Sequence, residues 1–285
     1  MINISALEDS IKLSEAMVMN LRPGVEKKIL WAGKPSVRSK ISIVFIHGFS
    51  ATRSELSPVI ENIAKAIKAN IFFTRLTGHG QDGKSLADAS FTDWTDDAYK
   101  AVAIGNIIGD KTILIGSSTG CSLIHTILSD SDNIMGAIYV SPNFAIKSSR
   151  GKFLRIPCTE LLLPFIFGKE ISFSSVNPDH KRCWTLSYPP RALLAIKEVV
   201  LSVNKVDHSK IKIPILFWFS DDDKIVSAKA TRKIIAKIGS NATVYNPTLN
   251  SGDDPSKHGI LGDILSPSQT NNGVKRILEW IQENN

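Results

Sequence analysis

The sequence predicts an α/β protein built on an open, mostly parallel sheet with helices on both faces. Short apolar, often β-branched runs alternate with segments in which apolar residues recur every three or four positions. The runs are apolar throughout instead of at every second residue, which is typical of strands covered on both faces. The chain has 285 residues, 43% of them hydrophobic, and this is enough for one large core or two small ones.

Six apolar runs are the predicted strands, and the first of them ends at His47-Gly48. The runs are residues 41–46, 71–73, 112–115, 137–140, 213–219 and 242–245. Helical spacing is plainest where Ile60, Ile63 and Ile67 recur at i, i+3 and i+7. The predicted helices cover residues 60–67, 93–108, 119–129, 190–203, 227–238 and 274–281. Strand followed by helix, repeated along the chain, favours parallel strands joined by helical crossovers.

Residues 143–188 interrupt this alternation. They contain no clear strand and are rich in Ser, Lys and Pro around an apolar core at residues 161–167. Structureless loops of such length are uncommon in compact domains unless they cover a site. We therefore predict a cap, or lid, inserted between two parts of the core, residues 41–142 and 189–285. A disordered excursion is the alternative, but it fits the apolar cluster poorly.

The first forty residues, 1–40, are predicted to extend the core. Residues 6–19 have a helical pattern, and residues 28–32 suit an extra strand. Glu8 and Asp9 stand near an N-terminus that lacks a basic segment followed by an apolar run, so no secretory signal is expected.

Composition narrows the expected partners. The net charge is +7, but Lys and Arg are scattered and aromatic residues make up 7% of the chain. A basic soluble surface is thus favoured, and nucleic acid is not an expected partner. The longest apolar stretch, residues 161–167, is far shorter than the roughly 20 residues that cross a bilayer, so stable membrane insertion is not expected. Cys121, Cys158 and Cys183 are odd in number and lack metal-ligand spacing, which favours a reducing, cytoplasmic location. No pattern predicts the oligomeric state.

The strongest chemical signal is the segment Gly116-Ser117-Ser118-Thr119-Gly120, which follows a predicted strand and opens a predicted helix. This is a G-x-S-x-G pattern in its strand–turn–helix context, and it puts Ser118 at the nucleophile. The turn is tight, so the residues two positions to either side must lack side chains. The hydroxyl stands at a helix N-terminus, where N–H groups favour developing negative charge. Taken alone, the segment also suits a plain strand-to-helix turn.

Three adjacent aspartates compete for the acid that orients the base. A serine nucleophile needs both groups, and open α/β sheets supply them in the chain order Ser, acid, His. Asp221, Asp222 and Asp223 follow the predicted strand at 213–219, at the carboxyl end where such a sheet carries its site. Asp223 is the predicted acid, because the Lys-Ile-Val after it turns the chain back to the core. Asp222 is the second candidate, and Asp221 and Asp222 also suit solvated or helix-capping positions.

His258 is the predicted base. It lies in the Gly-rich loop 251–262 after the last predicted strand, and it satisfies the chain order. Of the other five histidines, His125 lies two helical turns beyond Ser118 and out of reach. His47 and His79 are flanked by glycines and are expected to shape turns. His180 falls in the predicted cap, and His208 precedes a predicted strand.

Two backbone N–H groups are expected to form an oxyanion hole. The strand at 41–46 runs directly into His47-Gly48-Phe49, where the N–H of Phe49 is the first expected donor. The second is the N–H of Thr119, the residue after the nucleophile.

Together these segments resemble an α/β-hydrolase. The sequence is similar to the monoacylglycerol lipase and carboxylesterase branch, in which strand–HGF, L-x-GHG and G-x-S-x-G segments recur in this order. The matching segments are Phe45-Ile46-His47-Gly48-Phe49, Arg75-Leu76-Thr77-Gly78-His79-Gly80 and Gly116-Ser117-Ser118-Thr119-Gly120, followed by Asp223 and His258. The resemblance covers residues 42–284. It implies Ser118 as nucleophile, Asp223 as acid, His258 as base, and Phe49 and Thr119 as oxyanion donors.

The same resemblance implies a serine esterase or lipase that acts on a small-molecule carboxylic ester through an acyl-enzyme, with no cofactor and no metal. Its cap would shape an acyl pocket, for which Phe49, residues 161–167 and Trp184 are candidates, with plain packing as the alternative. The loop 250–258 departs from the family, because it is longer and more acidic than usual. The same fold also serves thioesterases, proline-type aminopeptidases or amidases, carbon–carbon hydrolases, haloperoxidases and non-catalytic binding proteins.

Overall fold

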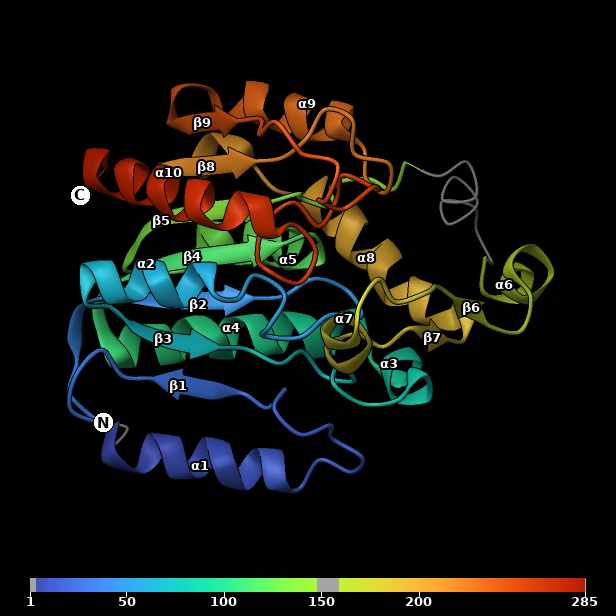
Figure 1. Cartoon of the computed structure of the whole chain (residues 1–285), viewed down its shortest axis with the longest axis horizontal. Coiled ribbons are helices and arrows are strands. Elements are labelled where there is room, and N and C mark those ends of the chain that lie inside the picture. The colour runs from blue at the N-terminus through green and yellow to red at the C-terminus, as the bar shows by residue number, and fades with distance from the viewer. Residues whose placement is uncertain (1–3, 148–158, 285) are drawn as a thin grey trace.

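The computed structural model describes residues 4–147 and 159–284, and within them a seven-stranded sheet forms the centre (Figure 1). The strand order is β1-β3-β2-β4-β5-β8-β9, and every neighbouring pair is parallel except β1 with β3. The strands are β1 Lys28–Leu30, β2 Ser39–Ile46, β3 Asn70–Phe73, β4 Gly109–Ser117, β5 Ile134–Val140, β8 Ile215–Trp218 and β9 Ala242–Tyr245. The predicted mostly parallel sheet is confirmed, and the extra strand expected within residues 28–32 is β1, which lies at one edge of the sheet.

Helices cover both faces of the sheet, which is why its strands are apolar throughout. In β2, Ile43 and Phe45 face a core shared with the two helices in front of the sheet in Figure 1, whereas Val44 and Ile46 face the opposite core. The front helices are α2 (Val59–Ile67) and α10 (Thr270–Glu283). The opposite core includes side chains of α1 (Ile4–Ala16), α4 (Phe91–Ile108), α5 (Thr119–Ile127), α8 (Leu193–Val203) and α9 (Ala228–Ile238). Successive strand residues point to opposite faces, so both must be apolar here.

The observed helices differ from their predicted limits by up to four residues at an end. The helix predicted over 6–19 ends at Ala16. Those predicted over 119–129 and 190–203 include a 3-10 turn, Leu128–Asp130 and Pro190–Ala192 respectively. Such turns are common at helix ends because the terminal N–H and C=O groups lack α-helical partners.

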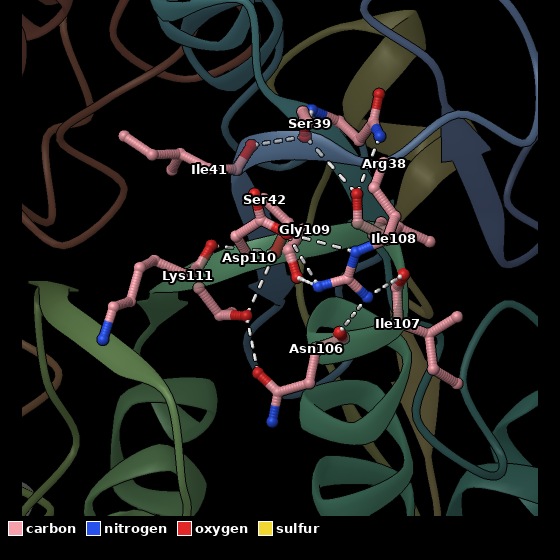
Figure 2. A network of polar contacts seen from close by, with 12 residues as sticks. Arg38, Ser39, Ile41, Ser42, Asn106, Ile107, Ile108, Gly109, Asp110 and Lys111 are labelled. Carbon is pink, nitrogen blue, oxygen red and sulfur yellow. Dashed lines mark hydrogen bonds and ion pairs between the residues drawn. The ribbon is translucent and has the colours of Figure 1, made fainter. Parts of the chain in front are cut away.

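Arg38 caps the last turn of α4 from the amino end of β2 (Figure 2). Its Nη1 donates to the carbonyl oxygens of Asn106 (2.9 Å) and Ile107 (2.8 Å), and its Nη2 donates to that of Gly109 (2.6 Å). Asp110 accepts two further hydrogen bonds from the guanidinium. The last carbonyls of a helix lack intrahelical partners, and a cation there also interacts favourably with the negative end of the helix dipole. This network joins β2, α4 and β4 at the amino ends of these two strands.

The predicted cap contains regular structure where it is described. Residues 159–188 form α6 (Thr159–Phe167), α7 (Pro178–Cys183) and the paired two-residue strands β6 (Ile171–Ser172) and β7 (Ser187–Tyr188). The expectation that this stretch holds no strand is therefore wrong, because pairs this short carry no apolar run. A disordered excursion does not describe these residues either. Residues 148–158 lie outside the described residues, and the 143–188 boundary stays a prediction.

The elements of the predicted cap lie beyond the carboxyl ends of the sheet strands, where β7 contacts the short helix α3 (Gly83–Asp88) (Figure 1). No pattern in the sequence predicts α3. Six residues are too few for a helical period to stand out, and its start depends on the Asp82 side chain, which accepts the Ser85 N–H at 2.8 Å.

A buried ion pair fastens α1 to the core. Glu15 Oε2 lies 2.6 Å from Arg75 Nε, Glu15 Oε1 lies 2.8 Å from Arg75 Nη2, and both side chains are 5% exposed. Replacing Glu15 by alanine leaves the guanidinium buried without its carboxylate, and breaking such a pair costs about 3–5 kcal/mol. We expect denaturant unfolding of Glu15→Ala to show a loss of that size. Asp9→Ala, at an exposed position of the same helix, is the control and should change stability by less than about 0.5 kcal/mol. Equal losses in both variants would contradict the role of the pair.

Candidate functional site

Ser118 lies in the sharp turn between β4 and α5. Its φ of 48° and ψ of −110° are rare for a residue with a side chain. A Cβ on Gly116 would come within 2.7 Å of the Cys121 nitrogen, and one on Gly120 within 2.0 Å of the Ile46 oxygen. Close backbone contacts therefore require both glycines, which is the crowding that the G-x-S-x-G pattern predicts.

Three side chains from three separate loops meet at the carboxyl ends of the strands. Ser118 follows β4, Asp223 follows β8 and His258 follows β9. His258 Nε2 lies 3.0 Å from Ser118 Oγ, and His258 Nδ1 lies 2.7 Å from Asp223 Oδ2. Ser118 and Asp223 are buried, while the imidazole is 19% exposed. The structure thus forms one hydrogen-bonded line from a hydroxyl to a buried carboxylate.

The proton positions on His258 follow from its neighbours. A carboxylate only accepts, so the imidazole proton lies on Nδ1 and is donated to Asp223, and Nε2 is left to accept from Ser118. Burial acts to lower the pKa of His258, but the hydrogen bond and charge of Asp223, together with the charges of Glu55 and Asp254, raise that pKa above its ordinary value. The site therefore favours the imidazolium that forms when His258 accepts a proton.

The three adjacent aspartates have different surroundings. Asp223 Oδ1 accepts the backbone N–H groups two and three residues further on, at 2.7 and 2.9 Å, which leaves Oδ2 for the imidazole. Asp222 points to Lys257 Nζ at 2.6 Å, and its side chain is 71% exposed. Asp221 pairs with Arg232. The structure brings Asp223, and not Asp222, to His258.

The long acidic loop before His258 is held by its own aspartates. Asp254 Oδ2 accepts the N–H of His258 (3.1 Å) and that of Gly259 (2.7 Å). Asp253 Oδ2 accepts the Asn250 N–H at 2.7 Å. The acidic loop stands out in the sequence as a departure from the family, but the pattern assigns no role to Asp254. Its position four residues before a candidate base is the signal that could have suggested one.

The His47-Gly48-Phe49 turn packs directly against the elbow, since a Cβ on Gly48 would lie 3.3 Å from that of Ser118. His47 Nε2 accepts the Leu76 N–H at 3.1 Å, so its proton lies on Nδ1 and is donated to the Gly48 oxygen at 2.9 Å. Burial lowers the pKa of His47 to about 4, so the ring is neutral near pH 7. The N–H and C=O of a trans peptide point in opposite directions, and the Phe49 N–H is therefore held away from His47.

The other expected donor is the first residue of α5, Thr119, whose N–H has no intrahelical partner. The half-buried ring of Phe49 packs edge-on against Tyr188, with 5.1 Å between ring centroids, and lies 6.0 Å from both Trp94 and His79. The backbone N–H of His79 donates to the Leu76 carbonyl oxygen, in keeping with the turn-shaping role expected of His79. An aromatic cluster thus supports the loop that carries Phe49.

The cap residues expected to line an acyl pocket have different surroundings. Trp184 is buried and packs with Ala51 and Cys183 in a small core between the loop after β2 and the predicted cap. Leu163 is also buried, whereas Phe165 is 88% exposed. The side chain of Leu161 lies outside the described residues. Packing is observed for Trp184, and pocket lining by the other candidates stays a prediction.

Sequence reasoning missed Glu55, a buried glutamate between β2 and α2. Its Oε2 accepts the Gly48 N–H at 2.6 Å, and burial raises the pKa of its carboxyl. A glutamate seven residues after a His-Gly turn, next to the apolar stripe of a helix, was the available signal. Its inward orientation follows only from the tertiary structure.

Solved structures of lipolytic proteins share this fold. A structure reported with the metagenome-derived lipolytic enzymes LipS and LipT has a TM-score of 0.73 and 19% identity, covering 92% of this chain and 99% of that one. A monoacylglycerol lipase of Paleococcus ferrophilus has a TM-score of 0.65 and 16% identity, covering 91% of this chain and 98% of that one. A monoglyceride lipase of Saccharomyces cerevisiae has a TM-score of 0.63 and 15% identity, covering 91% of each chain. At these identities the likeness shows the fold.

A match to a family model goes further than the likeness of fold. The family described as serine aminopeptidase, S33, matches residues 38–247, which is more than half of the chain. A search of curated proteins finds no match. Among the described helices, none is long and apolar enough to span a membrane. The chain belongs to the serine aminopeptidase S33 family and has the α/β-hydrolase fold.

Proposed function

We propose that the chain is a serine hydrolase of carboxylic esters, with Ser118 as nucleophile, His258 as general base and Asp223 as the acid that orients it. The observation that carries the proposal is the hydrogen-bonded line from Ser118 Oγ through the imidazole to Asp223. The lipolytic enzyme and the two monoacylglycerol lipases of the same fold support acyl esters or monoacylglycerol-like esters as substrates.

In the proposed reaction, His258 Nε2 takes the Ser118 proton as Oγ attacks the ester carbonyl carbon. Asp223 holds the ring and stabilises the imidazolium. The N–H groups of Phe49 and Thr119 donate to the tetrahedral oxyanion, and one such donor typically contributes about 10²–10³ in rate, or roughly 3–4 kcal/mol. The imidazolium then protonates the leaving alcohol. Water repeats the cycle on the acyl-enzyme and releases the acid.

Hydrolysis of an amide, as by a proline-type aminopeptidase, is the second candidate, because the matched family is described as serine aminopeptidase. The same three side chains serve both reactions, since the imidazolium can protonate a leaving amine as well as an alcohol. Substrate choice depends on the residues around these three.

A panel of p-nitrophenyl esters from acetate to palmitate, with prolyl and alanyl p-nitroanilides beside it, separates the two candidates. We expect turnover of esters that is abolished by a fluorophosphonate, and little turnover of the anilides. The ester with the highest kcat/KM measures the length of the acyl pocket. Turnover of anilides without esters would favour the amidase, and turnover of neither would overturn both candidates.

Activity is expected to rise with pH through a pKa above 6.5. Burial acts to lower the pKa of His258, but Asp223 and the neighbouring carboxylates raise it above its ordinary value of 6.5. Only the neutral imidazole accepts the Ser118 proton, so kcat/KM should fall about tenfold for each pH unit below that pKa. An uncharged ester, which does not titrate, is the substrate to use. A rate that is flat through neutrality would contradict the role of His258.

We further propose that the protein works in a reducing, cytoplasmic environment. Cys121 and Cys183 are unpaired and buried, which supports a setting in which thiols stay reduced.

A further inference from the structure

We propose that Glu55 is a positioning residue for ester hydrolysis, whose buried carboxyl ties the turn carrying one oxyanion donor to the elbow carrying the other. The inference rests on the proposed function, and it assigns a role to a side chain that touches neither substrate nor the reacting atoms.

The carboxyl of Glu55 contacts both loops of the site. Its Oε2 accepts the Gly48 N–H at 2.6 Å, and the nearby Ser117 hydroxyl favours the charged form of the same carboxyl. A Cβ on Gly48 would lie 2.9 Å from Oε1, so a larger residue there would push the carboxyl away. Glu55 is 8% exposed. A buried carboxyl with a backbone donor at 2.6 Å and a hydroxyl nearby is a specific arrangement, because an unpaired one would be costly.

Hydrogen bonds hold both peptide groups that flank the Cα of Gly48. Glu55 holds the peptide that precedes it through the N–H, and His47 Nδ1 holds the peptide that follows through the Gly48 oxygen, at 2.9 Å. Fixing both peptide planes fixes φ and ψ of a glycine that would otherwise be free. The direction of the Phe49 N–H is set by the second of those planes.

The two expected oxyanion donors need this connection, because they come from separate loops. Phe49 follows β2 and Thr119 follows β4. Ser117, which Glu55 contacts, is the last residue of β4 and lies two residues before Thr119. Misplacing a catalytic group by about 1 Å can cost on the order of 10²-fold in rate. A side chain that fixes the spacing of the two loops therefore acts on the transition state and little on substrate affinity.

This role needs acceptor oxygens and correct length, and not a negative charge. Glutamine keeps a carbonyl oxygen for the Gly48 N–H, and its amide can still bond the Ser117 hydroxyl. Alanine removes both contacts. A role through charge, such as stabilising the His258 imidazolium, predicts the opposite, because glutamine would then fail as badly as alanine.

The test compares Glu55→Ala and Glu55→Gln with the parent, using a p-nitrophenyl ester and a trifluoromethyl ketone. The ketone forms a hemiketal with Ser118 whose oxyanion occupies the hole, so its inhibition constant reports the hole directly. We expect Glu55→Ala to lower kcat by about 10–100-fold with KM changed less than about threefold, and to weaken the ketone by a similar factor. Glu55→Gln should return both values to within about fivefold of the parent. Glu61→Ala is the matched control, because Glu61, on α2, also accepts a hydrogen bond from a serine hydroxyl. This variant should change kcat less than about twofold.

An unchanged kcat in Glu55→Ala would overturn the proposal, as would equal losses in both Glu55 variants with ketone affinity intact. If Glu55→Ala does not fold, Ser117→Ala tests the second contact, and we expect about a 3–10-fold loss in both kcat and ketone affinity. No loss in Ser117→Ala together with a loss in Glu55→Gln would then overturn it. If the parent hydrolyses no ester, the proposed function fails, yet the ketone series still measures the hole. A parent that binds no ketone either would overturn both proposals.

Discussion

Replacing Ser118 by alanine is expected to lower kcat on p-nitrophenyl esters by about 10⁴–10⁶-fold. The change removes the oxygen that attacks the carbonyl carbon, and the residual rate comes from the oxyanion donors and from binding. The Ser118 side chain lies 3.0 Å from His258 Nε2, and no other hydroxyl is recorded at that nitrogen among the described residues. The measurement is steady-state turnover, with thermal unfolding beside it to establish that the variant is folded.

Ser36→Ala is a matched control for the Ser118 variant. Ser36 also has a positive φ, of 62°, but it lies before β2 at the opposite edge of the sheet. Both substitutions put alanine into a strained backbone position, and only one removes the hydroxyl beside the imidazole. We expect Ser36→Ala to retain the parent rate to within about twofold. A Ser118→Ala variant that kept more than a few per cent of the parent rate would rule out Ser118 as the nucleophile.

Replacing Asp223 by asparagine is expected to lower kcat by about 10⁴-fold. The asparagine oxygen can still accept the two backbone N–H groups that Asp223 Oδ1 accepts now, so the turn should keep its shape. The amide NH₂ would then face His258 Nδ1 and force that nitrogen to be the acceptor. The ring proton moves to Nε2, and the tautomer can no longer take a proton from Ser118.

Asp222→Asn is the control for this variant, and it changes the same chemistry one residue away. It removes an ion pair to Lys257 whose carboxylate is 71% exposed, and solvent screens such a pair. We expect kcat/KM to change less than about threefold. If Asp222→Asn were the more damaging change, the acid would be Asp222. Because the backbone contacts differ at the two positions, thermal unfolding of both variants should accompany the rate measurements.

Most of the sheet could be predicted from sequence because burial on both faces leaves a local trace. A strand such as β2 alternates its side chains between two apolar cores, so every residue from Ile43 to Ile46 is apolar. The short strands β6 and β7 and the six-residue helix α3 leave no such trace. Their positions depend on contacts with distant segments: Ile171 of β6 pairs with Tyr188 of β7, and a Cβ on Gly83 of α3 would lie 2.2 Å from the Ser187 oxygen.

The candidate site was predictable where a residue type is required by the backbone or by chain order. Gly116 and Gly120 are required by contacts of 2.7 and 2.0 Å that any Cβ would make. The order Ser, Asp, His restricted the base to His258. Composition and spacing carried no comparable information on Glu55 or Asp254, because a glutamate or aspartate in a loop is usually solvated.

The sequence alone predicts an α/β chain with an elbow at Ser118 and a histidine in the correct order after it. Apolar periodicity and obligatory glycines are local properties, and a single sequence records them directly. The three-dimensional structure shows which of three aspartates faces His258, how the acidic loop supports that residue, and that Glu55 lies beside both loops of the site. These are relations between segments far apart in the chain: His258 meets a serine 140 positions away and an aspartate 35 positions away. Such distances are closed by packing of the whole domain, which local pattern does not encode.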